Sequence, residues 1–494
     1  MKLTSALLIG FALVTPIIVF PDVVTDWNNV AIQAVRADAT HPGPTWASRH
    51  FAMVHVAIYD AVNAIDQTHQ PYHVAASAPP DTSREAAAAQ AAYRVLAAVH
   101  PTQKASLDAA LATSLASVAD GPGKAAGIAL GDSVGTEIVA WRSADGSSPE
   151  PPFTPGTNPG EWQPTAPDFT PALGPGWGKV VPFAMESGAQ FRPPPPPALT
   201  SAEYAAAFNS VKSLGARESS TRTAEQTQIG MFWGYDRQGM GPPLVFYNQI
   251  AQKIAAQRGS SLSENARLFA LINIAMADAG ISCWDCKYLF NLWRPITAIR
   301  EAGADGNPAT EADPAWEPLG APGGGVVPNF TPPFPAFTSG HATFGAALFR
   351  TLRHFYATDA VSFTLASDEL PGVERSFSSF SQAAAENGVS RIYLGIHWQF
   401  DNLVGQAGGR AVADHVYANF LTPRLAIGPA ADRLVASWPR SSRSFLLATT
   451  DNLSPPVSWL PIALPSEGPG GLNVVSILPV SPVRFFKLAL IGGN

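Results

Sequence analysis

The stretch FPAFTSGHATFGAALFRTLRHF, residues 334–355, constrains the fold more than any other. Past His341, apolar residues recur at steps of three and four positions, which predicts a helix with one buried face. These residues are Phe344, Leu348, Leu352 and Phe355. His341 therefore falls in the first turn of the predicted helix.

The start of this helix is suited to binding an oxyanion. A helix start offers unpaired backbone N–H groups and the positive end of the helix dipole. The Ser339 hydroxyl adds a hydrogen-bond donor, and Gly340 lets an anion approach the backbone closely. His341 supplies an acid/base at the edge of the site. The same tripeptide also fits an ordinary Ser-capped helix with a surface histidine. The other motifs of the chain are therefore needed to distinguish this alternative from an oxyanion site.

A second motif lies in a helical pattern that runs from Ser263 to Arg294 and meets a proline, which disfavours continuing the helix. Lys287 and Arg294 are seven positions apart, nearly two turns, so we expect both cations on one helix face. The residues expected to share this face are Trp284, Lys287, Asn291 and Arg294. Two stacked cations repel unless an anion lies between them. A solvated basic face is the alternative.

The third motif is SRIYLGIHWQFDN, residues 390–402, which holds Arg391, His397 and Asp401 and precedes a second helical pattern over 402–420. Asp401 follows His397 by four positions. It can cap the second helix or, if His397 is already in a helical turn, orient the imidazole. Together the three motifs supply three cations, backbone and hydroxyl donors and two histidines, which suits one multiply charged tetrahedral oxyanion.

The charge and the cysteine content exclude two other classes of protein. The 494-residue chain has a net charge of −7, so it offers no basic surface for nucleic acid. Its two cysteines, Cys283 and Cys286, cannot build a disulfide framework. Their spacing also fits a redox pair, but it lies inside the predicted helix and favours buried free thiols.

The three motifs, in the order Lys-x6-Arg-Pro, Ser-Gly-His and Ser-Arg-x5-His-x3-Asp, resemble those of the superfamily of vanadium haloperoxidases and type-2 phosphatidic acid phosphatases. The separations also match, with 43 residues between Pro295 and Ser339 and 48 between His341 and Ser390. Thr338 stands where the superfamily usually has proline. The similarity runs from about residue 23 to residue 421 and implies a mainly α-helical fold built of haloperoxidase-type helical bundles.

The resemblance also implies a vanadate cofactor and a role for each motif residue. Its equatorial oxygens would be bound by Lys287, Arg294, Ser339, Gly340 and Arg391. His397 would be the axial vanadium ligand and His341 the catalytic acid/base. Asp236 would be a supporting partner near the arginines. Lys287 would also take part in catalysis by polarising peroxide.

Among these enzymes the chain resembles the fungal-type chloroperoxidases, through FTPPFPAF, SGHATFGAA and HWQFDN. The resemblance places Trp284 and Phe334 at the halide site, and phenylalanine at 334 leaves chloride oxidation open beside bromide. It implies hydrogen peroxide, a halide and a small organic acceptor as partners. The alternatives are a soluble acid phosphatase, in which His397 attacks a phosphoester, and a non-catalytic oxyanion-binding surface protein.

Residue composition and hydrophobic patterning divide the chain into three parts. Residues 1–20 carry an apolar run that fits a signal peptide better than a membrane span, so we expect a secreted or periplasmic protein. Residues 21–425 form the expected catalytic domain, with a long aromatic- and proline-rich loop at 143–200 that we expect to wall a pocket. Residues 430–494 carry short β-type runs that predict a small β-sandwich-like attachment or packing module. We expect no membrane span in the mature body, and the oligomeric state is not indicated.

Within the catalytic part, four helical patterns with short joins predict an antiparallel bundle. They cover residues 45–65, 83–100, 101–119 and 123–142. His55, Asp60 and Asn63 interrupt the apolar face of the first and are expected to make structural hydrogen bonds. Further on, Thr200 and Glu203 predict a capping box for a helix over 201–214.

Overall fold

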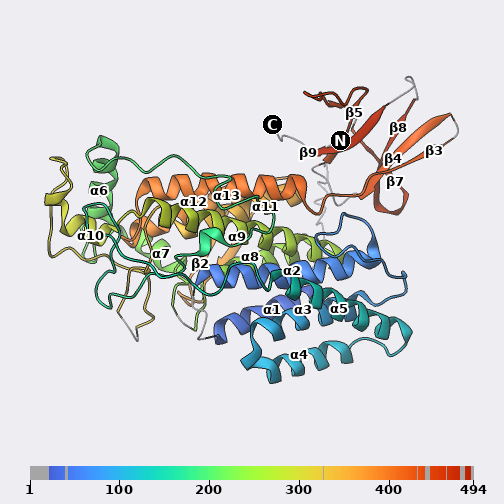
Figure 1. Cartoon of the computed structure of the whole chain (residues 1–494), viewed down its shortest axis with the longest axis horizontal. Helices are drawn as coiled ribbons and strands as arrows, with labels where there is room; N and C mark the ends of the chain where they lie inside the picture. Colours follow the sequence, from blue (N-terminus) through green and yellow to red (C-terminus); the bar gives the residue numbers. More distant parts are fainter. Residues whose placement is uncertain are drawn as a thin grey trace, which may run out of the picture.

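The computed structural model describes residues 22–38, 43–237, 239–325, 328–430, 432–439, 445–462, 464–478 and 484–490. Helices dominate it, and strands gather near the C-terminus, so the predicted mainly α-helical fold class is confirmed (Figure 1). The signal-like segment predicted over 1–20 lies outside the described residues.

The N-terminal helices stack side by side and form the lower layers in Figure 1. They are α1 (Val23–Ala37), α2 (Pro44–Asp66), α3 (Arg84–Val99), α4 (Lys104–Ala116) and α5 (Pro122–Arg142). The polar residues within α2 are structural, as predicted: Asp60 accepts hydrogen bonds from three backbone N–H groups at 2.7–2.9 Å, and His55 bonds Asn28 at 3.1 Å. They hold the chain that follows α2, and α1, against the helix.

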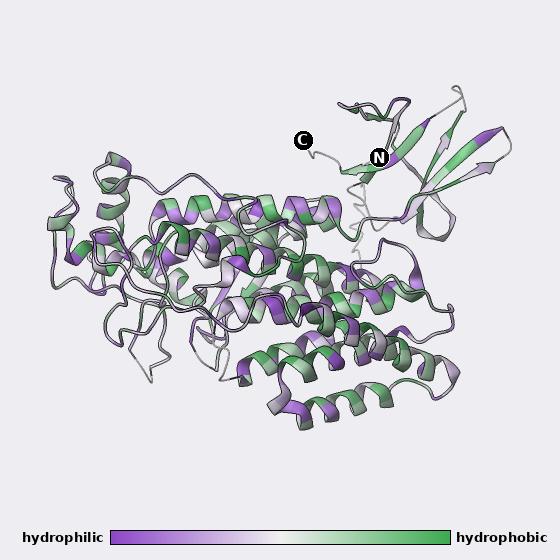
Figure 2. Ribbon diagram, viewed as in Figure 1, coloured by the Kyte–Doolittle hydropathy of each residue, from purple (hydrophilic) through white to green (hydrophobic). Residues whose placement is uncertain are grey.

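A second group of helices surrounds α9 (Leu262–Phe290), which contacts α2, α11 and α13. The group includes α8 (Pro243–Arg258), α11 (Gly340–Tyr356), α12 (Phe380–Tyr393) and α13 (Gln399–Asn419). Helix α9 is long and apolar enough to cross a membrane, but that stretch is fully buried inside the protein. Its environment is therefore that of a core helix. Figure 2 shows hydrophobic residues (green) along the helices of this body, interspersed with hydrophilic ones.

Short elements close one end of this group, on the left in Figure 1. They are α6 (Ala202–Leu214), α7 (Ala224–Phe232), α10 (Pro295–Arg300) and the hairpin of β1 (Phe363–Ala366) and β2 (Glu374–Phe377). Helix α6 is capped by Ser201, whose hydroxyl accepts from Tyr204 N at 3.1 Å. The predicted Thr200–Glu203 box was therefore wrong by one position.

Helix α9 ends earlier than its sequence pattern predicts. Its last residue is Phe290, and Asn291 adopts a left-handed conformation with φ of 48°. Asparagine tolerates this conformation better than most residues. Arg294 is extended and directly precedes α10, where Pro295 occupies the first turn. The prediction that Lys287, Asn291 and Arg294 share one helix face was therefore wrong.

Past α13 the chain forms two antiparallel sheets that pack through a small apolar core. One sheet has the order β3-β4-β8-β7 and the other β6-β5-β9. The strands are β3 (Ala426–Ala430), β4 (Arg433–Pro439), β5 (Phe445–Thr450), β6 (Leu460–Pro461), β7 (Ser466–Gly468), β8 (Leu472–Ile477) and β9 (Phe485–Leu490). This β-module lies at the end of the helical body opposite α6 and α10 (Figure 1).

Candidate active site

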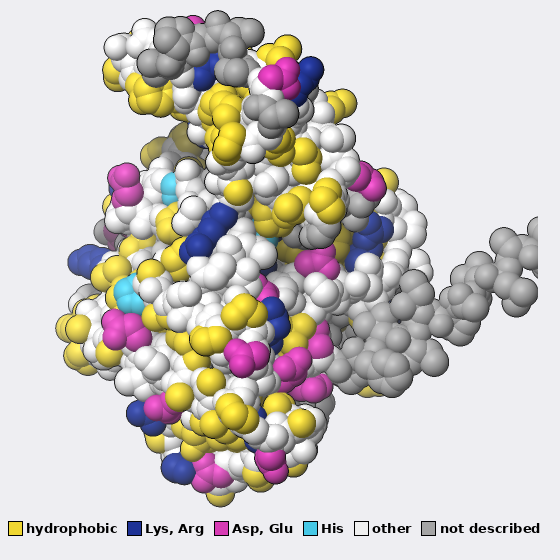
Figure 3. All heavy atoms as spheres, turned by 90° about the vertical axis from the view of Figure 1, so that its right-hand side faces the viewer, with side chains coloured by type: hydrophobic (Ala, Val, Ile, Leu, Met, Phe, Trp, Pro, Cys, Tyr) yellow, Lys and Arg dark blue, Asp and Glu magenta, His cyan; other side chains and the backbone are white. Residues whose placement is uncertain are grey.

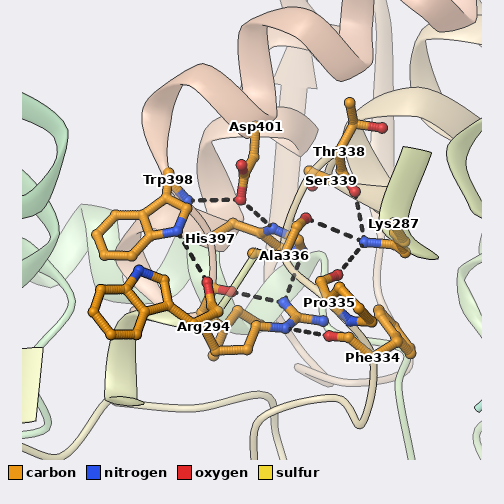
Figure 4. A network of polar contacts seen from close by, with 12 residues as sticks. Lys287, Arg294, Phe334, Pro335, Ala336, Thr338, Ser339, His397, Trp398 and Asp401 are labelled. Atoms are coloured by element: carbon orange, nitrogen blue, oxygen red, sulfur yellow. Dashed lines mark hydrogen bonds and ion pairs between the residues drawn. The ribbon is translucent and has the colours of Figure 1, made fainter. Parts of the chain in front are cut away.

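The residues of the three motifs meet where helix ends converge. Lys287 lies in the last turn of α9, Arg294 directly before α10, Ser339 directly before α11, Arg391 in the last turn of α12, and His397 two residues before α13. All are more than nine-tenths buried, as is His341. Figure 4 shows Lys287, Arg294, Ser339 and His397 around one centre. The fold thus brings together cations and a histidine that are up to 110 positions apart in the chain.

His397 is oriented by Asp401. Its Nδ1 is 2.8 Å from Asp401 Oδ2, and the same carboxylate oxygen accepts from Trp398 N at 3.0 Å. Asp401 therefore fulfils both of the roles left open by the sequence, since it caps α13 and orients the imidazole. Donation from Nδ1 leaves the lone pair of His397 on Nε2, which faces Arg294 Nη1 at 3.0 Å. Burial and the nearby cations lower the pKa of His397 well below its usual value, which keeps the ring neutral.

Several buried donors of this centre have no partner in the part of the protein that the structure describes. Arg294 donates from Nε to the Phe334 carbonyl and from Nη1 to the Ile396 carbonyl, both at 2.7 Å, while its Nη2 is unpartnered. Arg391 forms an ion pair with Asp236 through Nη2, while its Nε and Nη1 are unpartnered. The Ser339 hydroxyl is buried without a partner as well. Because unpaired buried donors are costly, this set is suited to an oxyanion that accepts from all of them.

Lys287 lies in the centre, but its ammonium group donates hydrogen bonds to backbone carbonyls. Nζ contacts the carbonyl oxygens of Pro335, Ala336 and Thr338 at 2.8, 3.2 and 2.6 Å (Figure 4). A lysine has three N–H donors, so this arrangement uses all of them. Burial lowers the pKa of Lys287. In this structure the lysine holds the turn that leads into Ser339.

His341 is held through both its ring and its backbone. Its Nε2 lies 2.8 Å from the Gly234 carbonyl, which makes Nε2 the donor nitrogen. Its own carbonyl accepts from Asn387 Nδ2 at 2.7 Å and from the Tyr247 hydroxyl at 3.2 Å. Burial, followed by the charge of Arg391, lowers the pKa of His341 to about 4. Sequence reasoning missed Gly234, Tyr247 and Asn387, although Gly234 stands two positions before the predicted Asp236.

A narrow pocket opens onto the centre. Its lining includes seven residues predicted from the sequence: Asp236, Trp284, Phe334, Gly340, His341, Arg391 and His397. The rings of Trp284 and Phe334 are 4.9 Å apart between centroids. Sequence reasoning missed the other residues of its lining, which are Pro44, Pro243, Pro332 and Phe344. Their apolar character matches the Trp284 and Phe334 wall, and only the tertiary contacts bring them to it.

The loop over 143–200 holds the Trp284 and Phe334 side of the pocket through hydrogen bonds. The Leu173 carbonyl accepts from Trp284 Nε1 at 3.2 Å and from the Tyr288 hydroxyl at 2.6 Å. The Leu173 N–H donates to the Pro333 carbonyl at 2.9 Å, next to Phe334. One residue of the loop thus connects the tryptophan side and the phenylalanine side of the pocket.

Comparison with known proteins identifies relatives of this chain. The family profile described as the VCPO second helical-bundle domain matches residues 267–423, which include the three motifs. Vanadium chloroperoxidase of Curvularia inaequalis is 29% identical over 483 residues, covering 76% of this chain and 78% of the relative. The crystal structure of the first bacterial vanadium-dependent iodoperoxidase is 30% identical, with a TM-score of 0.69, and the match covers 83% of this chain and 98% of that chain. The chain belongs to the vanadium-dependent haloperoxidases.

A further haloperoxidase structure supports the fold alone. The holo-type bacterial vanadium-dependent chloroperoxidase is 16% identical, with a TM-score of 0.64 over 81% of this chain and 98% of that chain. The cofactor of the protein described here is vanadate, as its membership of the vanadium-dependent haloperoxidases implies. The unpartnered donors of Arg294, Arg391 and Ser339 fit such an anion.

Proposed function

We propose that this haloperoxidase oxidises bromide or chloride with hydrogen peroxide to hypohalous acid. The observation that carries the proposal is the set of buried unpartnered donors on Arg294, Arg391 and Ser339, which lies beside the Nε2 of His397. Bound vanadate supplies a Lewis-acidic centre at which peroxide becomes reactive toward halide.

The chain's own residues would hold the anion in a fixed orientation. Arg294 Nη2 and the Nε and Nη1 of Arg391 would donate to its oxygens, together with the Ser339 hydroxyl and the Gly340 N–H. His397 would ligate it through Nε2, since its Nδ1 is engaged by Asp401. Asp236 keeps Arg391 in place through their ion pair.

His341 would move the protons of the reaction. Its ring lines the pocket that also holds Trp284, Phe334 and His397. The Gly234 carbonyl holds Nε2, so Nδ1 is the nitrogen free to exchange a proton. Lys287 would act by holding the Pro335–Thr338 turn and by placing a positive charge in the centre.

The halide would lie against Trp284 and Phe334. The Lys287 Nζ lies 5.4 Å from the centre of the Trp284 ring and 4.8 Å from that of Phe334. A polarisable anion between apolar rings and a nearby cation is partly dehydrated and still compensated in charge. Bromide and chloride remain our proposal, and the similarity to an iodoperoxidase makes iodide the third halide to test.

The test is halogenation of a simple β-diketone by the purified protein in phosphate-free buffer, with peroxide and each halide in turn, before and after adding orthovanadate. We expect activity that appears with vanadate and falls when phosphate is added. Hydrolysis of an aryl phosphate without any halogenation would instead support the acid phosphatase reading, with His397 as the nucleophile.

Two histidine variants separate the assigned roles. His397→Ala should abolish vanadate retention, whereas His341→Ala should retain vanadate and lose turnover. His415→Ala, a half-buried histidine further along α13, is the matched control and should change neither. Equal loss of vanadate in both active-site variants would contradict the roles, and full turnover of His341→Ala would support a non-catalytic part for that residue.

We also propose export from the cytoplasm, on the strength of the apolar run in residues 1–20. Fractionation of the producing cells and N-terminal sequencing of the mature protein test this. An intact N-terminus in the cytoplasmic fraction would contradict it.

A further inference from the structure

A large cavity lies at the seam between the helical body and the β-module, away from the active site. Its volume is about 710 Å³. Its wall on the helical side includes Tyr59, Arg267 and Phe355, and its wall on the β-module includes Pro439 and Leu472. In Figure 3, which faces this end of the molecule, the surface is hollowed where the two parts meet.

Arg267 is the unusual group of this seam cavity. The residue is 2% exposed, and its Nε donates to the Leu421 carbonyl at 2.9 Å. Both of its terminal nitrogens, Nη1 and Nη2, are buried without a hydrogen-bond partner among the described residues. The guanidinium carbon lies 5.5 Å from the centre of the Phe355 ring and 5.3 Å from that of Tyr417. A buried cation with unpaired donors is costly, which indicates that a ligand completes it.

The carboxylates on the cavity wall are engaged with other groups. Asp66 forms an ion pair with Arg84 and accepts from the Ser263 hydroxyl at 2.5 Å. Glu264 accepts from both the backbone N–H and the hydroxyl of Ser261 at 2.9 Å. Neither of these two carboxylates is therefore hydrogen-bonded to the terminal nitrogens of Arg267.

A second arginine borders the same cavity. Arg424 donates from Nε to the backbone carbonyl of His69, a lining residue, at 3.0 Å, and from Nη1 to the side-chain oxygen of Gln67 at 2.6 Å. These acceptors are neutral, so they do not cancel its charge. Within the lining, Arg84 and Arg267 are matched in number by Asp66 and Glu264, and Arg424 adds one positive charge next to it.

We propose that the seam cavity binds a carboxylate with an apolar body, held by Arg267. The two terminal nitrogens of a guanidinium form a planar fork that matches the two oxygens of a carboxylate. The rings of Tyr59 and Phe355 and the side chains of Pro439 and Leu472 would cover the apolar body.

This site is separate from the active site. Arg267 and Lys287 are 20 positions apart in α9, which corresponds to about 30 Å along the helix. Because the cavity is walled by both the helices and the β-module, the ligand would stabilise their docking. The inference therefore does not depend on the reaction that the active site performs.

The test is binding of 4-fluorophenylacetate to the full-length, vanadate-loaded protein, followed by ¹⁹F NMR. Vanadate occupies the oxyanion site and so removes it as a competing site. We expect saturable binding that Arg267→Gln weakens at least tenfold. Arg258→Gln, at the exposed end of α8, is the matched control and should bind like the parent. The neutral analogue 4-fluorophenethyl alcohol should bind more weakly than the carboxylate.

A second variant covers the case in which Arg267→Gln does not fold. Leu472→Trp would fill the cavity from the β-module and leave the helices untouched, and it should also abolish binding while circular dichroism stays unchanged. The proposal is overturned if the parent protein does not bind the probe, if both variants bind it as tightly as the parent, or if the alcohol binds as tightly as the carboxylate.

Discussion

The Lys287 ammonium donates to the Thr338 carbonyl at 2.6 Å, the shortest of its three contacts with the turn before Ser339. The lysine is fully buried, so these contacts balance its charge with backbone dipoles. They also join the end of α9 to the start of α11, which are 50 positions apart. Lys287 therefore shapes the oxyanion site in addition to lying within it.

Replacing this lysine should lower stability as well as activity. Lys287→Met keeps the chain length but leaves the three carbonyls unpaired, which should reduce the free energy of unfolding by roughly 3–5 kcal/mol. Urea unfolding of the vanadate-free protein measures this. Lys253→Met, at an exposed position of α8, is the control and should change it little. Unchanged stability with lost vanadate binding would show that Lys287 acts on the anion alone.

Asp401 should set the vanadate affinity through His397. Asp401→Asn retains an oxygen that can accept from Trp398 N, but it no longer carries the charge that holds the Nδ1 proton of His397. We expect the dissociation constant for vanadate to rise about 10- to 100-fold, as measured by ultrafiltration and vanadium analysis. Asp414→Asn on the same helix should leave it unchanged. An unchanged constant in Asp401→Asn would contradict the orienting role.

The motif residues could be identified from the sequence because their chemistry is local. Ser339 and His341 mark a helix start. The four-residue spacing between His397 and Asp401 predicted both roles of Asp401, which are to cap α13 and to orient the His397 ring. The path of the chain through Arg294 could not be predicted in this way. Asn291 ends α9 where Trp162, from the 143–200 loop, donates its N–H to the Asn291 carbonyl at 2.8 Å, and such a distant contact leaves no periodic signal.

Groups that depend on packing between distant segments were also missed. Asn387 and Tyr247 hold the His341 backbone from two other helices. Arg267 is one charged position in an apolar helical pattern, and only the folded structure shows that its terminal nitrogens are buried without a described partner. In physical terms, these features depend on contacts rather than on spacing.

The loop residue Gly174 should control the position of Trp284. Gly174 has φ of +73°, and a Cβ there would lie 2.8 Å from Trp284 Nε1. Gly174→Ala should therefore displace the indole and raise the KM for halide several-fold at unchanged vanadate affinity. Gly408→Ala on α13, where a Cβ meets nothing within 4 Å, is the control. A KM equal to that of the parent would show that Trp284 does not shape the halide site.

His55 should make the fold sensitive to acid. It is fully buried in α2 beside Asn28, and burial lowers its pKa to about 3. The unfolded chain, with an ordinary histidine pKa near 6.5, takes up this proton first as the pH falls. The folded state should therefore lose about 2 kcal/mol of stability between pH 6.5 and 4.5 through this residue.

The comparison of the parent with His55→Gln isolates this contribution from those of other groups. Glutamine can still donate to Asn28 but does not titrate, so its packing cost should be similar at both pH values. Urea unfolding should give the parent a higher free energy of unfolding than the variant at pH 7. This difference should be smaller by about 2 kcal/mol at pH 4.5. If the difference in the free energy of unfolding stays constant with pH, His55 is protonated in the folded state as readily as in the unfolded chain.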